Sequence, residues 1–269
     1  WAGARAAYER ALDYAREAGS SGAEGRAMGR LADTYLHDAN ASYAIHLLRD
    51  AILKITNAGD HEPRSYFTGI LGLALIESGQ DAEGLQLLDR ALRIAEQIGY
   101  RGYARHWAGV LGDRAMAEGR YADAHNYYAH ALRLFAPETV SAEYVGVVTR
   151  ISRANLSLRN ADDALAYAQI ALTTAEKLGD TALTRTAQGA YGMALRAAGR
   201  SAEAIPYLQA AADAPESSTD VLRSLAAAQA DSGDMDGAVR TYTRAIQQAE
   251  AAGIPLELAQ ARRDLGLVY

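Results

Sequence analysis

Small residues recur along this chain at a nearly constant interval, and this period restricts the possible folds more than any other feature. The recurring positions are Ala4, Ala44, Gly84, Ala124, Ala164, Ala204 and Ala238, which are 40 residues apart except for a last interval of 34. A fixed period in this range is typical of solenoids, which stack similar supersecondary units. Solenoids present a long surface to a partner, so the period predicts an interaction scaffold and not an enzyme.

Each recurring position starts an apolar stripe with helical spacing. In the second copy Ala44 is followed by Leu48, Ala51 and Ile52, and the other copies repeat this spacing. Apolar residues at i, i+4, i+7 and i+8 lie on one side of an α-helix. The stripe therefore predicts one helix in each unit, which we name helix B.

A second small residue lies twelve residues before each recurring position from Ala44 onward, usually after an apolar residue. The pairs are Leu31 and Ala32, Leu71 and Gly72, Leu111 and Gly112, Ile151 and Ser152, Tyr191 and Gly192, and Leu225 and Ala226, with a seventh copy at Leu265 and Gly266. They predict a second helix, helix A, that precedes helix B. A glycine inside a helix costs about 1 kcal/mol relative to alanine. The recurrence of Gly72, Gly112 and Gly192 therefore indicates a close crossing of helices A and B.

Glycine also recurs where helices are expected to end, because it adopts the left-handed cap conformation without strain. It follows helix A at Gly79, Gly119, Gly199 and Gly233, and follows helix B at Gly19, Gly59, Gly99, Gly179 and Gly253. Ala39 and Arg159 replace it in two units. The short last interval contains Pro215, Glu216, Ser217 and Ser218, so we expect a shortened loop after Ala214.

The combined pattern, Leu-Gly-x-x-Tyr in helix A and Ala-x-x-x-Tyr-x-x-Ala-Leu in helix B, resembles the tetratricopeptide repeat (TPR) over essentially the whole chain. This resemblance implies an all-α fold, a right-handed α-α superhelix. We expect about six full helix pairs from about residue 24 to 253, flanked by half-repeats, in a single array over residues 1–269. Trp1 falls inside a helix B and Tyr269 inside a helix A, so we expect a fragment of a longer protein.

Composition and motifs argue against several classes of site. The chain has no cysteine and a net charge of −6, which disfavours disulfides, thiolate metal sites and non-specific nucleic-acid binding. Neither Lys54 nor Lys177, the only lysines, follows a glycine as a phosphate loop requires. The histidines lack the spacing of a metal-binding pair. We therefore expect no catalytic residue, cofactor or metal.

The same composition also bears on the cellular setting. No apolar run approaches the roughly 18 residues that span a bilayer, so we expect no membrane association. The absence of cysteine fits a cytoplasmic protein. Heavy use of alanine and arginine suggests a GC-rich bacterial genome.

The TPR resemblance implies that helix A lines a concave groove. The residues that it places inward are Arg26, Asp33, His37, Tyr66, Leu73, Glu77, His106, Asp113, Thr149, Arg153, Thr186, Met193, Arg196 and Arg223, with Tyr103 at the rim. Candidate partner-binding residues among them are Tyr66, Tyr103, His106, Asp113, Arg153, Arg196 and Arg223. Tyrosine and histidine would act as anchors, and arginine suits carboxylate or phosphate recognition. Alternatively, these arginines are solvated or paired with neighbouring carboxylates.

Long-period arrays rich in alanine and arginine are similar to the C-terminal sensor regions of SARP-type and LuxR-type bacterial transcriptional regulators. This resemblance implies a non-catalytic domain that binds an effector, a protein or peptide partner, or other domains of the same chain, without contacting nucleic acid itself. Two alternatives stay open. One is a free-standing adaptor that assembles a protein complex, and the other is a receptor that holds a peptide or small ligand in its groove.

Overall fold

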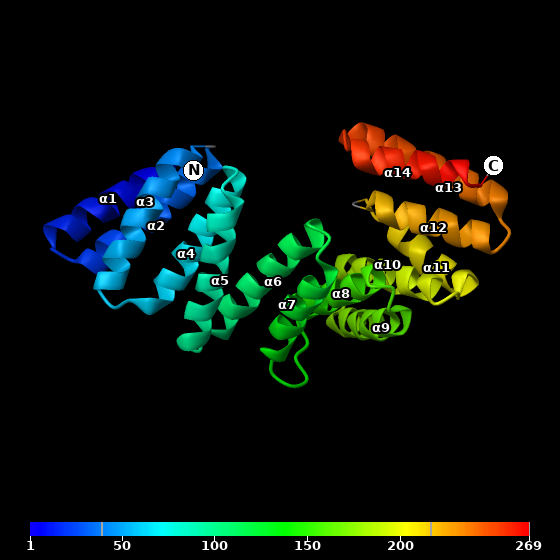
Figure 1. Ribbon diagram of the computed structural model, residues 1–269, viewed down its shortest axis with the longest axis horizontal. Coiled ribbons are helices and arrows are strands. Elements are labelled where there is room, and N and C mark those ends of the chain that lie inside the picture. Colours follow the sequence, from blue (N-terminus) through cyan, green and yellow to red (C-terminus); the bar gives the residue numbers. More distant parts are fainter. Residues whose placement is uncertain (39, 216, 269) are drawn as a thin grey trace. The chain divides into compact units, whose positions relative to one another are not determined.

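The computed structural model of the chain describes residues 1–38, 40–215 and 217–268, and all regular secondary structure in these ranges is helical (Figure 1). The chain divides into two compact units, Trp1–Ala115 and Met116–Tyr269. The first unit contains α1 (Ala2–Glu17), α2 (Ser21–His37), α3 (Ala41–Asn57), α4 (His61–Glu77), α5 (Asp81–Gln97) and most of α6 (Arg101–Ala117).

The second unit continues the alternation of helices A and B. It contains α7 (Tyr121–Arg133), α8 (Ala142–Ser157), α9 (Ala161–Leu178), α10 (Thr181–Ala197), α11 (Ser201–Ala212), α12 (Thr219–Asp231), α13 (Met235–Ala252) and α14 (Pro255–Gly266). In chain order α2 to α13 alternate six times between a helix A and a helix B, with α1 as a helix B before them and α14 as a helix A after them. The predicted all-α class and repeat order are confirmed, whereas the prediction of a single array stays a prediction.

Glycines end the helices at the predicted positions. All nine glycines predicted to follow a helix have positive φ, from 62° at Gly19 to 88° at Gly233. Arg159, which replaces glycine after α8, adopts the same left-handed conformation with φ of 62°. The other replacement, Ala39, lies outside the described residues. The backbone conformation at the helix end is therefore kept at Arg159 although the side chain changes.

The prediction of a shortened loop after Ala214 is wrong. The linker between α11 and α12 covers residues 213 to 218, of which Glu216 is not described, and it is longer than the linker of Gly179 and Asp180 between α9 and α10. The two helices are shortened instead, to 12 and 13 residues. The shorter interval therefore takes its residues from α11 and α12 and not from the linker between them.

Helices A and B of one pair cross where the small residues meet. A Cβ added to Gly72 would lie 2.8 Å from the carbonyl oxygen of Gly84, and one added to Gly192 would lie 2.6 Å from Leu208 Cγ. In α8 the equivalent residue is Ser152, whose hydroxyl donates a hydrogen bond of 2.8 Å to the carbonyl oxygen of Ala164. The predicted crossing is thus confirmed at Gly72 and Gly192, and the same prediction for Gly112 stays a prediction.

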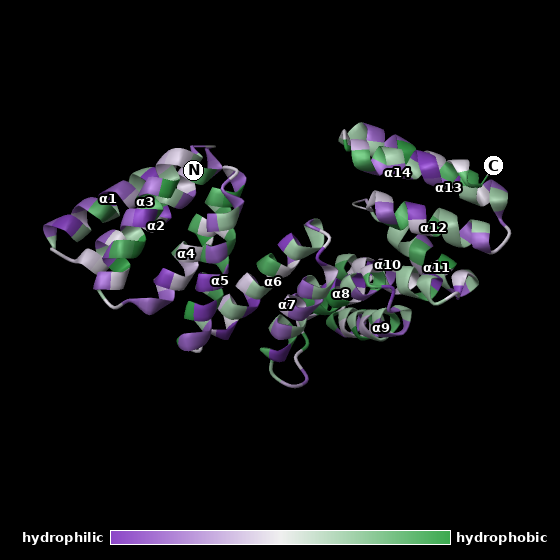
Figure 2. Cartoon of the chain, viewed as in Figure 1, coloured by the Kyte–Doolittle hydropathy of each residue, from purple (hydrophilic) through white to green (hydrophobic). Residues whose placement is uncertain are grey.

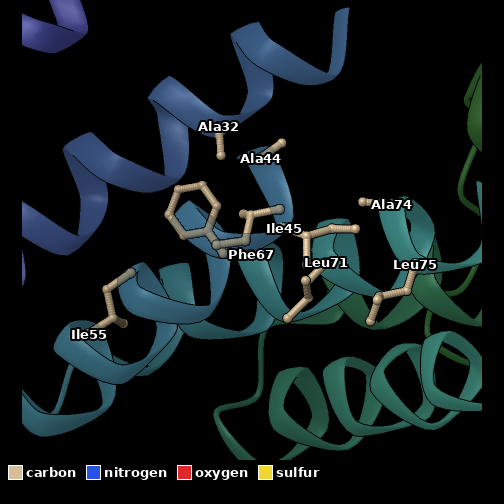
Figure 3. Packing of buried hydrophobic residues seen from close by; sticks show 9 residues of the cluster. Ala32, Ala44, Ile45, Ile55, Phe67, Leu71, Ala74 and Leu75 are labelled. Atoms are coloured by element: carbon tan, nitrogen blue, oxygen red, sulfur yellow. The ribbon is translucent and has the colours of Figure 1, made fainter. Parts of the chain in front are cut away.

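The apolar stripes of the helices make the core. In Figure 3, Ala32 of α2, Ala44, Ile45 and Ile55 of α3, and Phe67, Leu71, Ala74 and Leu75 of α4 form one cluster in the first unit. In Figure 2, hydrophobic (green) and hydrophilic (purple) residues alternate along the helix ribbons. Within residues 1–38, 40–215 and 217–268, no helix has both the length and the apolar character needed to cross a bilayer.

We expect Gly72→Ala to destabilise the first unit, because its new Cβ would press on the backbone of α5. Overpacking of this kind costs about 1–3 kcal/mol, which lowers the melting temperature by roughly 3–10 °C in a chain of this size. Thermal unfolding followed by circular dichroism measures the shift.

Gly146→Ala in α8 is the matched control, because a Cβ added there has no atom within 4 Å. Replacing an uncrowded glycine inside a helix stabilises it by about 0.5–1 kcal/mol. Equal melting temperatures for the two variants would contradict the crossing.

Candidate functional site

Aromatic rings packed on glycines set the spacing of successive A helices in the first unit. A Cβ added to Gly29 of α2 would lie 2.5 Å from the ring of Phe67 in α4. A Cβ added to Gly69 of α4 would lie 2.2 Å from the ring of Trp107 in α6. Both rings are almost fully buried. These contacts fix how α2, α4 and α6 lie side by side.

The helices fixed in this way bring two predicted site residues together. Tyr66 precedes Phe67 on α4, and Tyr103 lies about one turn before Trp107 on α6. Their ring centroids are 5.7 Å apart. Tyr103 also contacts Tyr100, with ring centroids 4.6 Å apart. The result is a small aromatic surface on the A helices of the first unit.

This aromatic surface borders a pocket of about 280 Å³. The residues that line it are Arg26, Arg30, Asp60, Glu62, Pro63, Tyr66, Phe67 and Tyr103, and we name it the tyrosine pocket. The wall combines aromatic rings with charges of both signs. A pocket of this size fits one long side chain, since pockets for whole small molecules are typically about 300–1,000 Å³.

Arg30 and Asp33 hold Tyr66 in place. The guanidinium carbon of Arg30 lies 4.8 Å from the centroid of the Tyr66 ring, and Arg30 Nη1 lies 3.5 Å from Asp33 Oδ2. The Tyr66 hydroxyl donates a hydrogen bond of 3.4 Å to the same oxygen. On the same helix α2, Arg26 forms an ion pair with Asp60. Both arginines of the tyrosine pocket therefore have a carboxylate partner.

The surroundings shift three pKa values in this region. Burial raises the pKa of Tyr66, and the charge of Asp33 raises it further. Burial also raises the pKa of Tyr103, with contributions from Tyr100 and from the charge of Glu62. Burial raises the pKa of Asp33 as well, against the opposing effects of Arg30 and Tyr66. Both phenols therefore remain protonated at neutral pH.

The other predicted residues of the first unit lie outside the tyrosine pocket. His106 is exposed on α6, and its ring makes a T-shaped contact with the ring of Trp107 at a centroid distance of 4.5 Å. Asp113 is exposed two turns further along α6. Neither residue lines the pocket, although both are on the helix that contributes Tyr103.

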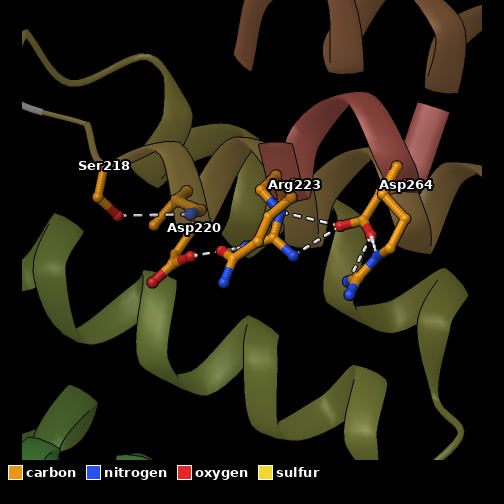
Figure 4. Close-up of polar contacts among 7 residues, drawn as sticks. Ser218, Asp220, Arg223 and Asp264 are labelled. Atoms are coloured by element: carbon orange, nitrogen blue, oxygen red, sulfur yellow. Dashed lines mark hydrogen bonds and ion pairs between the residues drawn. The ribbon is translucent and has the colours of Figure 1, made fainter. Parts of the chain in front are cut away.

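The predicted arginines of the second unit differ in whether they form ion pairs. Arg153 is exposed, and it forms no ion pair with the described residues. Arg196 lies 3.8 Å from the carboxylate of Asp231, a weak pair. In contrast, Arg223 binds Asp264 of α14 through Nε and Nη2 at 2.9 and 2.6 Å (Figure 4). Arg223 therefore stabilises the packing of α12 on α14.

Besides the buried ring of Phe67, sequence reasoning missed Arg30, Asp60, Glu62 and Pro63 as pocket residues. Arg30 lies four residues after Arg26, which was predicted to face inward, so the helical period could have included it. The other three stand at the start of α4, where acidic residues and proline are favoured at helix N-termini. In the sequence, a binding role for these residues therefore looks the same as this ordinary role at a helix N-terminus.

A second pocket lies between α9 and α10 in the second unit. Its volume is about 410 Å³, and its lining is Glu176, Gly179, Thr181, Thr184, Arg185 and Gln188. It has no aromatic or aliphatic wall. In residues 1–38, 40–215 and 217–268, no three histidine or carboxylate side chains are arranged to hold a metal ion.

No protein-family model and no curated protein matches the chain. Several solved structures match its fold. The apo form of RapI matches with a TM-score of 0.74 and 12% identity, over 97% of this chain and 79% of its own. The apo form of the quorum sensor NprR from B. thuringiensis matches with a TM-score of 0.60 and 18% identity, over 89% and 71%.

A third similar structure is a signal transduction ATPase with numerous domains (STAND) from Pyrococcus horikoshii, described as having a TPR sensor. It matches with a TM-score of 0.68 and 17% identity over 97% of this chain, and the chain spans 40% of its length. Identities this low establish the fold alone. The chain thus has the helix-pair fold of TPR proteins, as its repeats predicted.

The Arg223–Asp264 contact makes the stability of the second unit dependent on pH. Burial would raise the pKa of Asp264, but hydrogen bonds and charges from Arg263 and Arg223 outweigh it and hold the pKa below its usual value. The ionised carboxylate therefore stabilises the fold above the unfolded pKa of about 3.9. This contribution disappears as the pH falls below that value through the lowered pKa of the folded state.

We expect Arg223→Met to destabilise the chain by about 1 kcal/mol at pH 7, since solvent partly screens this pair. The difference from the unchanged chain should shrink when urea unfolding is repeated below about pH 4. Arg200→Met, which removes an exposed pair with Glu203, is the control and should leave stability nearly unchanged. An effect of Arg223→Met that is independent of pH would contradict the assignment.

Proposed function

We propose that the chain is a non-catalytic interaction module that binds an extended segment of a protein or peptide. In this proposal the binding surface is the face of α2, α4 and α6 that carries the tyrosine pocket. The observation that supports it is the placement of Tyr66 and Tyr103 beside each other at this pocket. Tyrosine and arginine are the side chains that most often dominate binding energy at interfaces.

The size of the tyrosine pocket favours a segment over a free small molecule. About 280 Å³ accommodates one side chain. The rest of a bound segment would then lie along the exposed A-helix residues, including His106 and Asp113. A free-standing small ligand would have no further enclosed wall to bury the rest of its surface.

We further propose that the chain is the sensor or interaction domain of a bacterial transcriptional regulator in the cytoplasm. Two similar structures are described as sensors, the STAND protein with its TPR sensor and the quorum sensor NprR. The net charge of −6 is unfavourable for non-specific contact with nucleic acid, so DNA binding would belong to another part of such a regulator. A bound partner should then change the DNA affinity of the full-length protein. A free-standing adaptor would show no such change.

Selection from a library of random peptides displayed on phage tests the binding surface. We expect Tyr66→Ala and Tyr103→Ala each to weaken binding of the selected peptides by about tenfold or more, as for anchor residues. The melting temperature should change little, because both side chains are only partly buried. His106→Ala and Arg153→Ala measure the contributions of the other predicted residues.

Tyr14→Ala is the matched control, because Tyr14 is a 70% exposed tyrosine on the helix B that begins the same unit. It should leave peptide affinity unchanged. If Tyr14→Ala weakens binding and the changes at Tyr66 and Tyr103 do not, the binding surface is on the B helices. The A-helix proposal is then rejected.

A further inference from the structure

The first unit contains a repeated arrangement of three groups: a tyrosine ring, a guanidinium over its face and a carboxylate that pairs with the guanidinium. One example joins α1 and α2. The guanidinium carbon of Arg5 lies 4.3 Å from the centroid of the Tyr35 ring, and Arg5 forms an ion pair with Asp38. The cation is attracted by both the ring face and the carboxylate.

The second example borders the tyrosine pocket. Arg30 covers the Tyr66 ring at 4.8 Å and pairs with Asp33 at 3.5 Å. Here the cation and the carboxylate come from α2 and the ring comes from α4. The same three chemical groups thus meet in two places, between α1 and α2 and between α2 and α4.

A third tyrosine ring and a carboxylate lie at the tyrosine pocket, but no cationic side chain among the described residues is bound to either of them. Tyr103 of α6 and Glu62 of α4 both line it. The charge of Glu62 contributes to the raised pKa of Tyr103, as expected for two neighbouring groups. Across the residues that the structure describes, Glu62 forms no ion pair, and no guanidinium lies over the Tyr103 ring.

The two arginines of the tyrosine pocket do not supply the missing cation. Arg26 pairs with Asp60, and Arg30 pairs with Asp33. Each pair is formally neutral, so Glu62 leaves one uncompensated negative charge at the pocket. Ile70 and Leu73 of α4 are the residues equivalent to Arg30 and Asp33 in the next repeat. Neither carries a charge, so the repeat supplies no cation for Tyr103 and Glu62.

We propose that the tyrosine pocket accepts a basic side chain of the bound segment, and that arginine is preferred to lysine. This inference rests on the proposed function. The cation packs over the Tyr103 ring and pairs with Glu62, which completes the third example of the arrangement. Arginine is preferred because its planar guanidinium stacks on a ring and binds a carboxylate through two hydrogen bonds.

Other side chains fit the pocket less well. An acidic side chain would be repelled by Glu62, and it would have to displace Asp60 or Asp33 to reach an arginine. An apolar side chain would remove water from Glu62 without giving it a partner, which is costly for a charged group. A basic side chain is the class that compensates Glu62 and keeps both existing ion pairs.

The direct test is titration of the chain with three blocked amino acids, followed by NMR of the Tyr66 and Tyr103 ring protons. The probes are N-acetyl-arginine methylamide, its citrulline analogue, which has nearly the same shape without the charge, and its glutamate analogue. We expect the arginine probe to shift both rings and to bind about three- to tenfold more tightly than the citrulline probe. The glutamate probe should bind weakest.

Paired variants locate the interaction within the pocket. Glu62→Gln should reduce the affinity for the arginine probe to that for the citrulline probe. Glu17→Gln, an exposed glutamate at the end of the B helix α1, is the control and should not. Tyr103→Phe keeps the ring and should retain binding, whereas Tyr103→Leu should lose it. Equal effects of the two glutamine variants would overturn the proposal.

The outcomes separate this inference from the proposed function. If the citrulline or glutamate probe binds as tightly as the arginine probe, the preference for a cation is wrong, although the pocket still binds side chains. If no probe shifts either ring, the cation site is rejected, and peptides selected on phage then decide whether this face binds at all. Loss of both kinds of binding rejects the proposed function as well.

Discussion

The close approach of two paired helix backbones, seen in α4–α5, α8–α9 and α10–α11, is the constraint on which the other features depend. At Gly72 the backbone of α5 is so near that a single added carbon would lie 2.8 Å from a carbonyl oxygen. Ser152 fits at the same place because its hydroxyl makes a hydrogen bond to that carbonyl position. Because the helices are this close, the apolar stripe of helix B is buried against helix A. The remaining face of helix A is then left for polar and aromatic residues.

The repeat period predicted the order of the helices because glycine recurs where the backbone must adopt the left-handed conformation that ends a helix. Gly79 and Gly199 have positive φ where an ending was predicted. The period did not reveal how a shorter interval divides between helix and linker. The total length is the same whether residues are lost from the loop after Ala214 or from α11 and α12. Only the helix bounds seen in the structure, with α11 of 12 residues and α12 of 13, decide between them.

The candidate site was predictable where it follows helical register and unpredictable where it depends on side-chain reach. Register placed Tyr66 and Tyr103 on the same side of successive A helices, and they do lie together. Asp60 and Glu62 were missed because acidic residues at a helix start have an ordinary structural role. The pairing of Arg223 with Asp264 joins residues 41 positions apart, so no local pattern could indicate it.

The rings that pack on glycines also determine what kinds of length change such an array tolerates. Helix α4 carries both parts of the contact, since Phe67 fills the space at Gly29 and Gly69 receives Trp107. Ring and space are two residues apart on the same helix. Adding or removing one whole repeat therefore keeps a ring facing a space. An insertion of a few residues inside one of these helices rotates ring and space out of alignment, so arrays of this design grow most readily by duplication of complete repeats.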